Sequence, residues 1–121
     1  MTISRNSQNL IEKFIEYATI EGETKENGDY KLGNKMSKKL NEIFDILKGD
    51  NELAEKVLGA VLHSEVASAQ SIAAVDALRL NILVKQSIKI LEKISKQQSM
   101  IAFGSRMALK IYRGEVTSKT L

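Results

Sequence analysis

The sequence predicts an all-α chain of about six helices in antiparallel pairs. Three observations support this fold class. The 121 residues include no proline and no cysteine, and they are rich in Lys, Glu, Ala, Leu and Ile, a composition that favours helices. Apolar residues recur at helical spacing, and no useful length of sequence alternates with period two. Connections of about 2–6 residues separate the helical stretches, which favours antiparallel neighbours. The length fits a single domain over residues 1–121.

The first half of the sequence predicts two long helices. The first is capped by Ser4 or Asn6, and its pattern fades at Gly22. Asn27-Gly28-Asp29 predicts a turn in which Asp29 caps the second helix. That helix ends at Lys48-Gly49, with a basic residue before a glycine. The apolar faces are Leu10, Ile11, Phe14, Ile15 and Ala18 in the first helix, and Met36, Leu40, Ile43, Phe44 and Leu47 in the second.

The second half predicts four shorter helices. Asp50 or Asn51 caps the third helix, and Ser64 caps the fourth, which is rich in alanine and therefore suits packing on more than one side. Asn81 ends the fourth helix or caps the fifth, and residues 97–99 separate the fifth from the sixth. Residues 115–121 are expected to form a frayed tail. Segments 68–78 and 104–112 echo each other at an offset of about 35 residues, which favours a stack of helical hairpins over a compact bundle.

The composition excludes several kinds of chemistry. A sequence without cysteine and with one histidine has no thiolate site and no His-rich metal site. No Gly-rich phosphate loop and no nucleophile elbow is present. We therefore expect no catalytic residue, no metal, no cofactor and no enzymatic activity, and we interpret His63 as a local cap or packing residue. No segment approaches the ~20 apolar residues of a membrane helix, and the N-terminus lacks the apolar core of a signal peptide, so we expect a cytoplasmic protein.

Charge is unevenly distributed along the sequence. The net charge is +3, but residues 81–121 carry eight Lys/Arg and only two Asp/Glu, whereas acidic residues gather near Glu23 and Asp29. Helical spacing places seven cations on two stripes. These are Lys85, Lys89, Lys93 and Lys96 on the fifth helix, and Arg106, Lys110 and Arg113 on the sixth. Such stripes are also the ordinary solvated faces of amphipathic helices.

Three segments resemble a small bacterial family of helical domains. Residues 21–31, from Glu21 through the Gly28-Asp29-Tyr30 turn to Lys31, are followed by Asn34-Lys35, as in that family. His63-Ser64-Glu65-Val66 before the Ala-rich helix and residues 101–109 resemble its later segments. The resemblance spans roughly residues 8–113. It implies a HEAT/armadillo-like right-handed stack, and an association with polymorphic toxin systems such as contact-dependent growth inhibition, in which such domains resemble immunity proteins.

The resemblance implies that the protein binds the C-terminal domain of a cognate toxin, such as a nuclease, and blocks its active site. Apart from this complex we expect a monomer. The contact is made either by the basic stripes or by the acidic turn together with the fourth helix. The candidate partner-binding residues are expected at exposed positions of the second helix in each of the last two pairs, with two reserve positions on the fifth helix. They are Glu65, Asp76, Arg79, Lys85, Lys89, Phe103, Arg106, Lys110 and Arg113.

Two other functions stay open from the sequence. A nucleic-acid-binding helical-repeat module would use Lys85, Lys89, Lys93, Arg106 and Lys110 against phosphates. The lack of an aromatic platform for stacking bases argues against this alternative. A small scaffold with a different protein partner would share the same fold.

Overall fold

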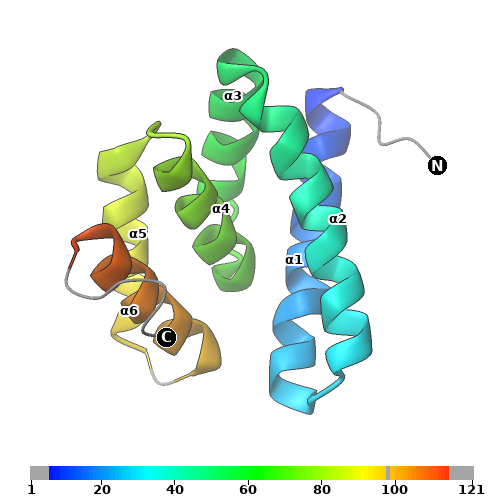
Figure 1. Cartoon of the computed structure of the whole chain (residues 1–121), viewed down its shortest axis with the longest axis vertical. Helices are drawn as coiled ribbons and strands as arrows, with labels where there is room; N and C mark the ends of the chain where they lie inside the picture. The colour runs from blue at the N-terminus through cyan, green and yellow to red at the C-terminus, as the bar shows by residue number, and fades with distance from the viewer. Residues whose placement is uncertain (1–5, 98, 115–121) are drawn as a thin grey trace.

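The computed structural model describes residues 6–97 and 99–114, and every regular element in these ranges is an α-helix (Figure 1). The helices are α1 (Ser7–Asn27), α2 (Tyr30–Lys48), α3 (Asn51–Leu62), α4 (Ala67–Arg79), α5 (Val84–Ser95) and α6 (Met100–Tyr112). The prediction of an all-α fold with six helices is confirmed. The tail predicted at residues 115–121 lies outside the described residues.

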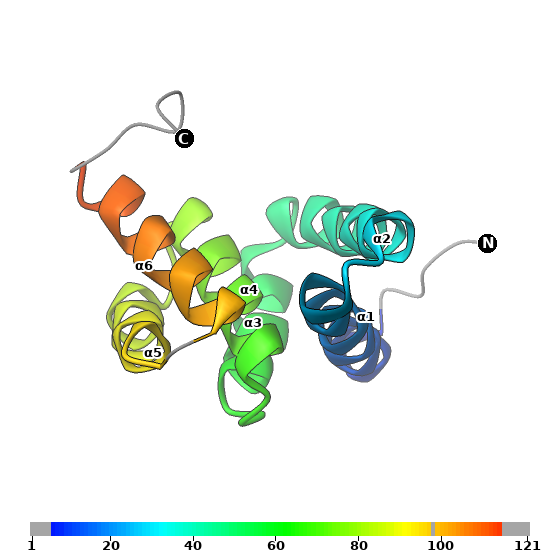
Figure 2. The same ribbon diagram turned by 90° about the horizontal axis from the view of Figure 1, so that it is seen from below.

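Consecutive helices form three hairpins that lie side by side in sequence order. The α1–α2 hairpin occupies one end of the molecule, α3–α4 the middle and α5–α6 the other end, in both views (Figures 1 and 2). Within each hairpin the two helices pack on each other, and α1 also packs on α3 and α4, while α4 packs on α5 and α6. The expected antiparallel pairs are thus arranged as a stack.

Side-chain caps fix the start of four helices. In each, an oxygen of the cap accepts a hydrogen bond from a backbone N–H two or three residues into the helix, which is worth about 1 kcal/mol. The caps are Asn6 to Asn9 N at 3.2 Å, Asp29 to Leu32 N at 3.2 Å, Asp50 to Leu53 N at 3.1 Å and Ser99 to Ala102 N at 3.0 Å. Asp29 confirms the sequence prediction, and Asn6 and Asp50 settle the two alternatives left open there.

The predicted caps of α4 and α5 are wrong. Helix α4 begins at Ala67, because the Ser64 Oγ accepts a hydrogen bond from the nearby Val66 N at 3.3 Å instead of capping the helix. Helix α5 begins two residues later than an Asn81 cap would place it. Asn81 (φ 58°) and Leu83 (φ 48°) both adopt left-handed backbone in the connection, and Leu83 is the N-cap without a side-chain bond. Non-glycine residues rarely adopt this conformation, so propensity did not indicate it.

Helix α1 continues through Gly22 to Asn27, and so does not fade where the sequence pattern does. A Cβ at Gly22 would lie 2.8 Å from the Cβ of Ser68 on α4, so glycine permits a close approach of the two helices. Gly33 of α2 likewise permits a close approach of α2 to α1, because a Cβ at this position would lie 2.6 Å from Thr24 Oγ1. The glycine in α1 therefore marks helix packing and not a helix end.

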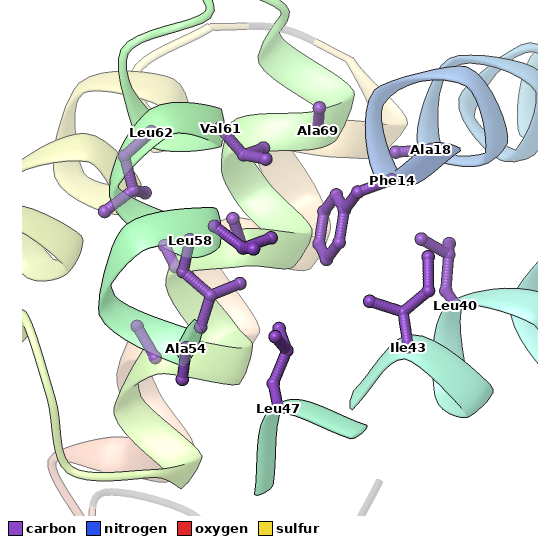
Figure 3. Packing of buried hydrophobic residues seen from close by; sticks show 14 of the residues in the cluster. Phe14, Ala18, Leu40, Ile43, Leu47, Ala54, Leu58, Val61, Leu62 and Ala69 are labelled. Atoms are coloured by element: carbon purple, nitrogen blue, oxygen red, sulfur yellow. The ribbon is translucent and has the colours of Figure 1, made fainter. Parts of the chain in front are cut away.

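The main core lies between α1, α2, α3 and α4. Phe14 is fully buried and points from α1 toward Leu40 and Ile43 of α2 on one side and the α3 residues on the other (Figure 3). Burying a phenylalanine contributes about 2–3 kcal/mol. Four of the five alanines of α4, at positions 69, 73, 74 and 77, are fully buried. Their small size lets four helices pack around α4, which confirms the expectation that this helix is covered on more than one side.

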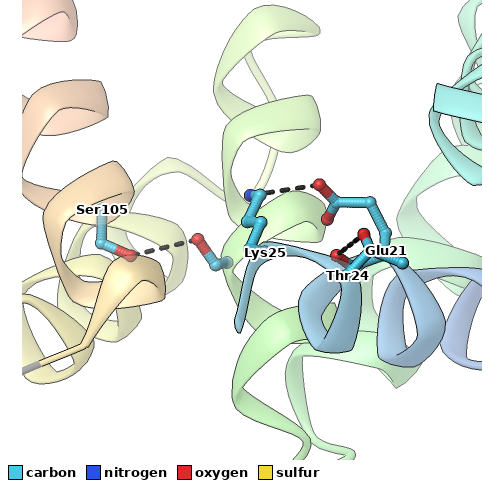
Figure 4. A network of polar contacts seen from close by, with 5 residues as sticks. Glu21, Thr24, Lys25 and Ser105 are labelled. Carbon is cyan, nitrogen blue, oxygen red and sulfur yellow. Dashed lines mark hydrogen bonds and ion pairs between the residues drawn. The ribbon is translucent and has the colours of Figure 1, made fainter. Parts of the chain in front are cut away.

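A polar seam lies where α1, α4 and α6 approach one another (Figure 4). The hydroxyls of Ser71 and Ser105 are 3.0 Å apart, and Ser105 is fully buried. On α1, Lys25 Nζ is 3.2 Å from Glu21 Oε1, and Thr24 Oγ1 donates to the Glu21 carbonyl at 2.6 Å. The Ser71–Ser105 contact joins α4 to α6, whereas the other two bonds satisfy polar groups within α1.

Candidate protein-binding pocket

An apolar pocket of about 420 Å³ lies between α4 and α6. Its lining residues are Val75, Leu78 and Arg79 from α4, and Ala108, Ile111 and Tyr112 from α6. Ile111 is 36% exposed and Tyr112 is 44% exposed, so both extend apolar surface to the solvent beside the pocket. Exposed aromatic and aliphatic groups beside a pocket are typical of a binding surface.

Arg79 is the charged residue of this lining, and it is held on two sides. Its guanidinium carbon lies 4.0 Å from the centre of the Phe44 ring of α2, a cation–π contact. Its Nη1 lies 3.8 Å from Asp76 Oδ1, which is an ion pair beyond hydrogen-bond distance. The side chain is still 56% exposed. Arg79 therefore links α2 to the pocket and keeps its donors available.

Asp76 lies beneath Arg79 and is only 6% exposed. Desolvation by burial raises the pKa of this carboxyl to about 7, and the Arg79 charge opposes the rise. We predicted Asp76 at an exposed position, and that prediction is wrong. Asp76 follows Ala69 and Ala73 at helical spacing, so it shares their buried face of α4.

The other candidate residues are not gathered into one site. Glu65 is exposed, but it lies in the connection before α4 and has φ 61°. Lys85 and Lys89 are exposed on α5, and Phe103 (55% exposed) and Lys110 are exposed on α6. None of these five is among the pocket lining residues.

Two arginines of the predicted α6 stripe bind α5. The Arg106 Nη1 donates to the carbonyls of Ser95 at 2.6 Å and Gln97 at 3.3 Å, where α5 ends. The Arg113 Nη2 lies 3.3 Å from Glu92 Oε1 of α5. Both arginines therefore hold the last hairpin together, and each remains partly exposed.

Sequence reasoning identified Arg79 but missed most of the pocket. Val75, Ile111 and Tyr112 carry no motif, and Phe44 was assigned to the core face of its helix. The apolar character of Ile111 and Tyr112 is visible in the sequence, but it does not distinguish a pocket wall from a core face, since adjacent residues such as Val57 and Leu58 are both fully buried.

A second exposed aromatic lies at the Gly28-Asp29-Tyr30 turn between α1 and α2. Tyr30 is 79% exposed and Leu32 is 38% exposed. Glu23 and Glu26 precede them on exposed positions of α1. This acidic turn is distant in the fold from the α4–α6 pocket, since it belongs to the first hairpin and lies at its end (Figure 1).

The described residues lack a candidate metal site. They contain no group of three or more His, Cys, Asp and Glu side chains that would hold a metal ion. His63 is the C-cap of α3, and its Nδ1 lies 2.8 Å from the Gly59 carbonyl, so its predicted role as a local cap is confirmed.

Among the described residues no helix combines the length and the hydropathy that crossing a membrane requires. Comparison of the sequence and fold with protein-family models, curated proteins and solved structures finds no match.

Proposed function

We propose that this protein is an immunity protein, a helical stack that neutralises a cognate toxin domain by covering part of its surface. The observation that carries the proposal is the open α4–α6 pocket, whose apolar walls end in exposed Ile111 and Tyr112. Tyrosine and arginine at a pocket are the residue types that dominate binding energy at protein interfaces. The resemblance at the Gly28-Asp29-Tyr30 turn supports the identity of the partner as a toxin.

A co-expression experiment tests this function. The protein is produced together with the toxin domain encoded by the adjacent upstream gene, and growth and complex formation are measured. We expect restored growth and a stoichiometric complex on size exclusion. Continued toxicity with no complex would contradict the proposal.

Two variants then identify the binding face. Tyr112→Ala alters the α4–α6 pocket, and Tyr30→Ala alters the acidic turn at the other end of the stack. Tyr112 is 44% exposed and Tyr30 is 79% exposed, so neither substitution removes a buried core side chain. Loss of protection with Tyr112→Ala and not with Tyr30→Ala assigns the toxin contact to the pocket.

Nucleic-acid binding is the second candidate, and one observation favours it. The stripe that the sequence predicted is exposed, with Lys85, Lys89 and Lys93 on α5 and Lys96 at the C-cap of that helix. Binding through such a stripe would weaken steeply with salt. The slope of log affinity against log salt concentration would be about −0.9 for each phosphate contacted in double-stranded DNA. The absence of a mobility shift for RNA and DNA at low salt would dismiss this alternative.

A further inference from the structure

The α4–α6 pocket combines apolar walls with one cation. Its volume of about 420 Å³ falls in the range of pockets that hold small ligands or anchor side chains, roughly 300–1,000 Å³. Five of its six lining residues are apolar or aromatic. A large apolar group that enters would remove this surface from water at about 25 cal/mol per Å². The walls therefore select an apolar group such as a phenylalanine or leucine side chain.

Arg79 adds a requirement for negative charge. Its contact with Phe44 at 4.0 Å fixes the direction of the guanidinium without using its N–H donors. Within the described residues the guanidinium makes no hydrogen bond, and its nearest acid, Asp76, is 3.8 Å away. An arginine with open donors in a fixed orientation is suited to a carboxylate, which can accept two parallel hydrogen bonds.

Asp76 neutralises Arg79 only in part. Burial raises the pKa of Asp76 to about 7, so near neutral pH a large share of these side chains is protonated. The positive charge of Arg79 is then only partly compensated by Asp76, its nearest acid at 3.8 Å. An incoming carboxylate meets no fixed acid among the pocket lining residues.

We propose that the α4–α6 pocket binds an apolar side chain of the protein partner that carries a carboxylate next to it, with the carboxylate paired to Arg79. The partner would present a residue such as phenylalanine or leucine beside Asp, Glu or its own terminal carboxylate. This inference rests on the proposed function, in that the occupant belongs to a protein.

A matched pair of small probes tests the chemistry. N-acetyl-phenylalanine carries the ring and a carboxylate, and N-acetyl-phenylalaninamide carries the same ring without the charge. Each is titrated into the full-length protein while methyl NMR signals are followed. We expect saturable shifts at Val75, Leu78 and Ile111, and an affinity about two- to fivefold higher for the acid, the factor that one partly exposed ion pair supplies.

Arg79→Gln is expected to abolish the preference for the acid, so that the acid and the amide bind this variant with the same affinity. Lys38→Gln on α2 removes the same charge at an exposed position that is not in the pocket, so the preference should persist. Three results would overturn the inference. These are equal affinities for acid and amide, shifts confined to other methyl groups or absent, and shifts that follow protein concentration without probe, which would mean that a second copy fills the pocket.

The toxin complex separates this inference from the proposed function. Ala108→Phe fills the pocket from within, and Tyr112→Ala alters its exposed edge, so at least one should give a folded protein by circular dichroism. We expect each folded variant to bind the toxin domain at least tenfold more weakly. Undiminished binding by a folded variant would contradict the pocket inference while the immunity function stands. Probe binding without any toxin protection would contradict only the function.

Discussion

At the scale of single residues, Asp76 makes stability depend on pH. Its pKa is 3.8 in an ordinary environment and about 7 in the fold, so between these values the folded state binds more protons than the unfolded state. The contribution of Asp76 to stability is complete below about pH 4 and is lost as pH rises through 7, at up to about 1.4 kcal/mol per pH unit. We predict that Asp76→Asn raises the midpoint of urea unfolding at pH 8 and has little effect at pH 4.

The control for this prediction is Asp45→Asn, which changes an exposed aspartate on α2. Its unfolding midpoints should follow those of the original protein at every pH. If Asp76→Asn retains the same loss of stability between pH 5 and 8, then a different group is responsible.

Glu65 gives a second prediction at this scale. Its φ of 61° costs a non-glycine residue about 1 kcal/mol. We expect Glu65→Gly to raise the free energy of unfolding by roughly 0.5–1 kcal/mol, measured by chemical denaturation. Glu55→Gly, at an exposed position inside α3, should lower it by about 1 kcal/mol. Equal losses for both variants would show that the Glu65 conformation is not strained.

At the scale of helices, glycine has opposite effects at two positions. A Cβ at Gly33 would lie 2.6 Å from Thr24 Oγ1 on α1, whereas a Cβ at Gly104 on α6 meets nothing within 4 Å. We predict that Gly33→Ala destabilises the fold by about 1–3 kcal/mol through overpacking. Gly104→Ala should stabilise it by about 1 kcal/mol through helix propensity. Thermal unfolding measures both, and a gain for Gly33→Ala would mean that α1 and α2 separate readily.

The helices were largely predictable from sequence because their signals are local. Caps such as Asp29 and Asp50 lie within a few residues of the groups they bind, and the apolar faces of α1 and α2 repeat at helical spacing. The close approach that explains Gly22 inside α1 involves Ser68, which is 46 positions away, and the start of α5 involves a left-handed Leu83. The pocket likewise forms only when α4 and α6 meet, so no single segment contains its pattern. Only Arg79 was identified, through its charge.

At the scale of the whole molecule, α4 determines how the stack unfolds. Open repeat arrays contact only their neighbours and can unfold in parts. Here the buried α4 packs on α1, α3, α5 and α6, so removing either end hairpin would expose its alanine face. We predict a single transition in which far-ultraviolet circular dichroism and tyrosine fluorescence have the same midpoint. Separate midpoints would show that a hairpin unfolds on its own.

The contact between α1 and α6 has a consequence for how this architecture can vary. Ile101 on α6 lies 3.8 Å from the position of a Cβ at Gly22 on α1, across the end of α4. Inserting another hairpin in the middle would pull these two side chains apart and open the seam around Ser71 and Ser105. The contact of α1 with α6 therefore ties this arrangement to three hairpins, and a chain with an added central hairpin would have to fold without it.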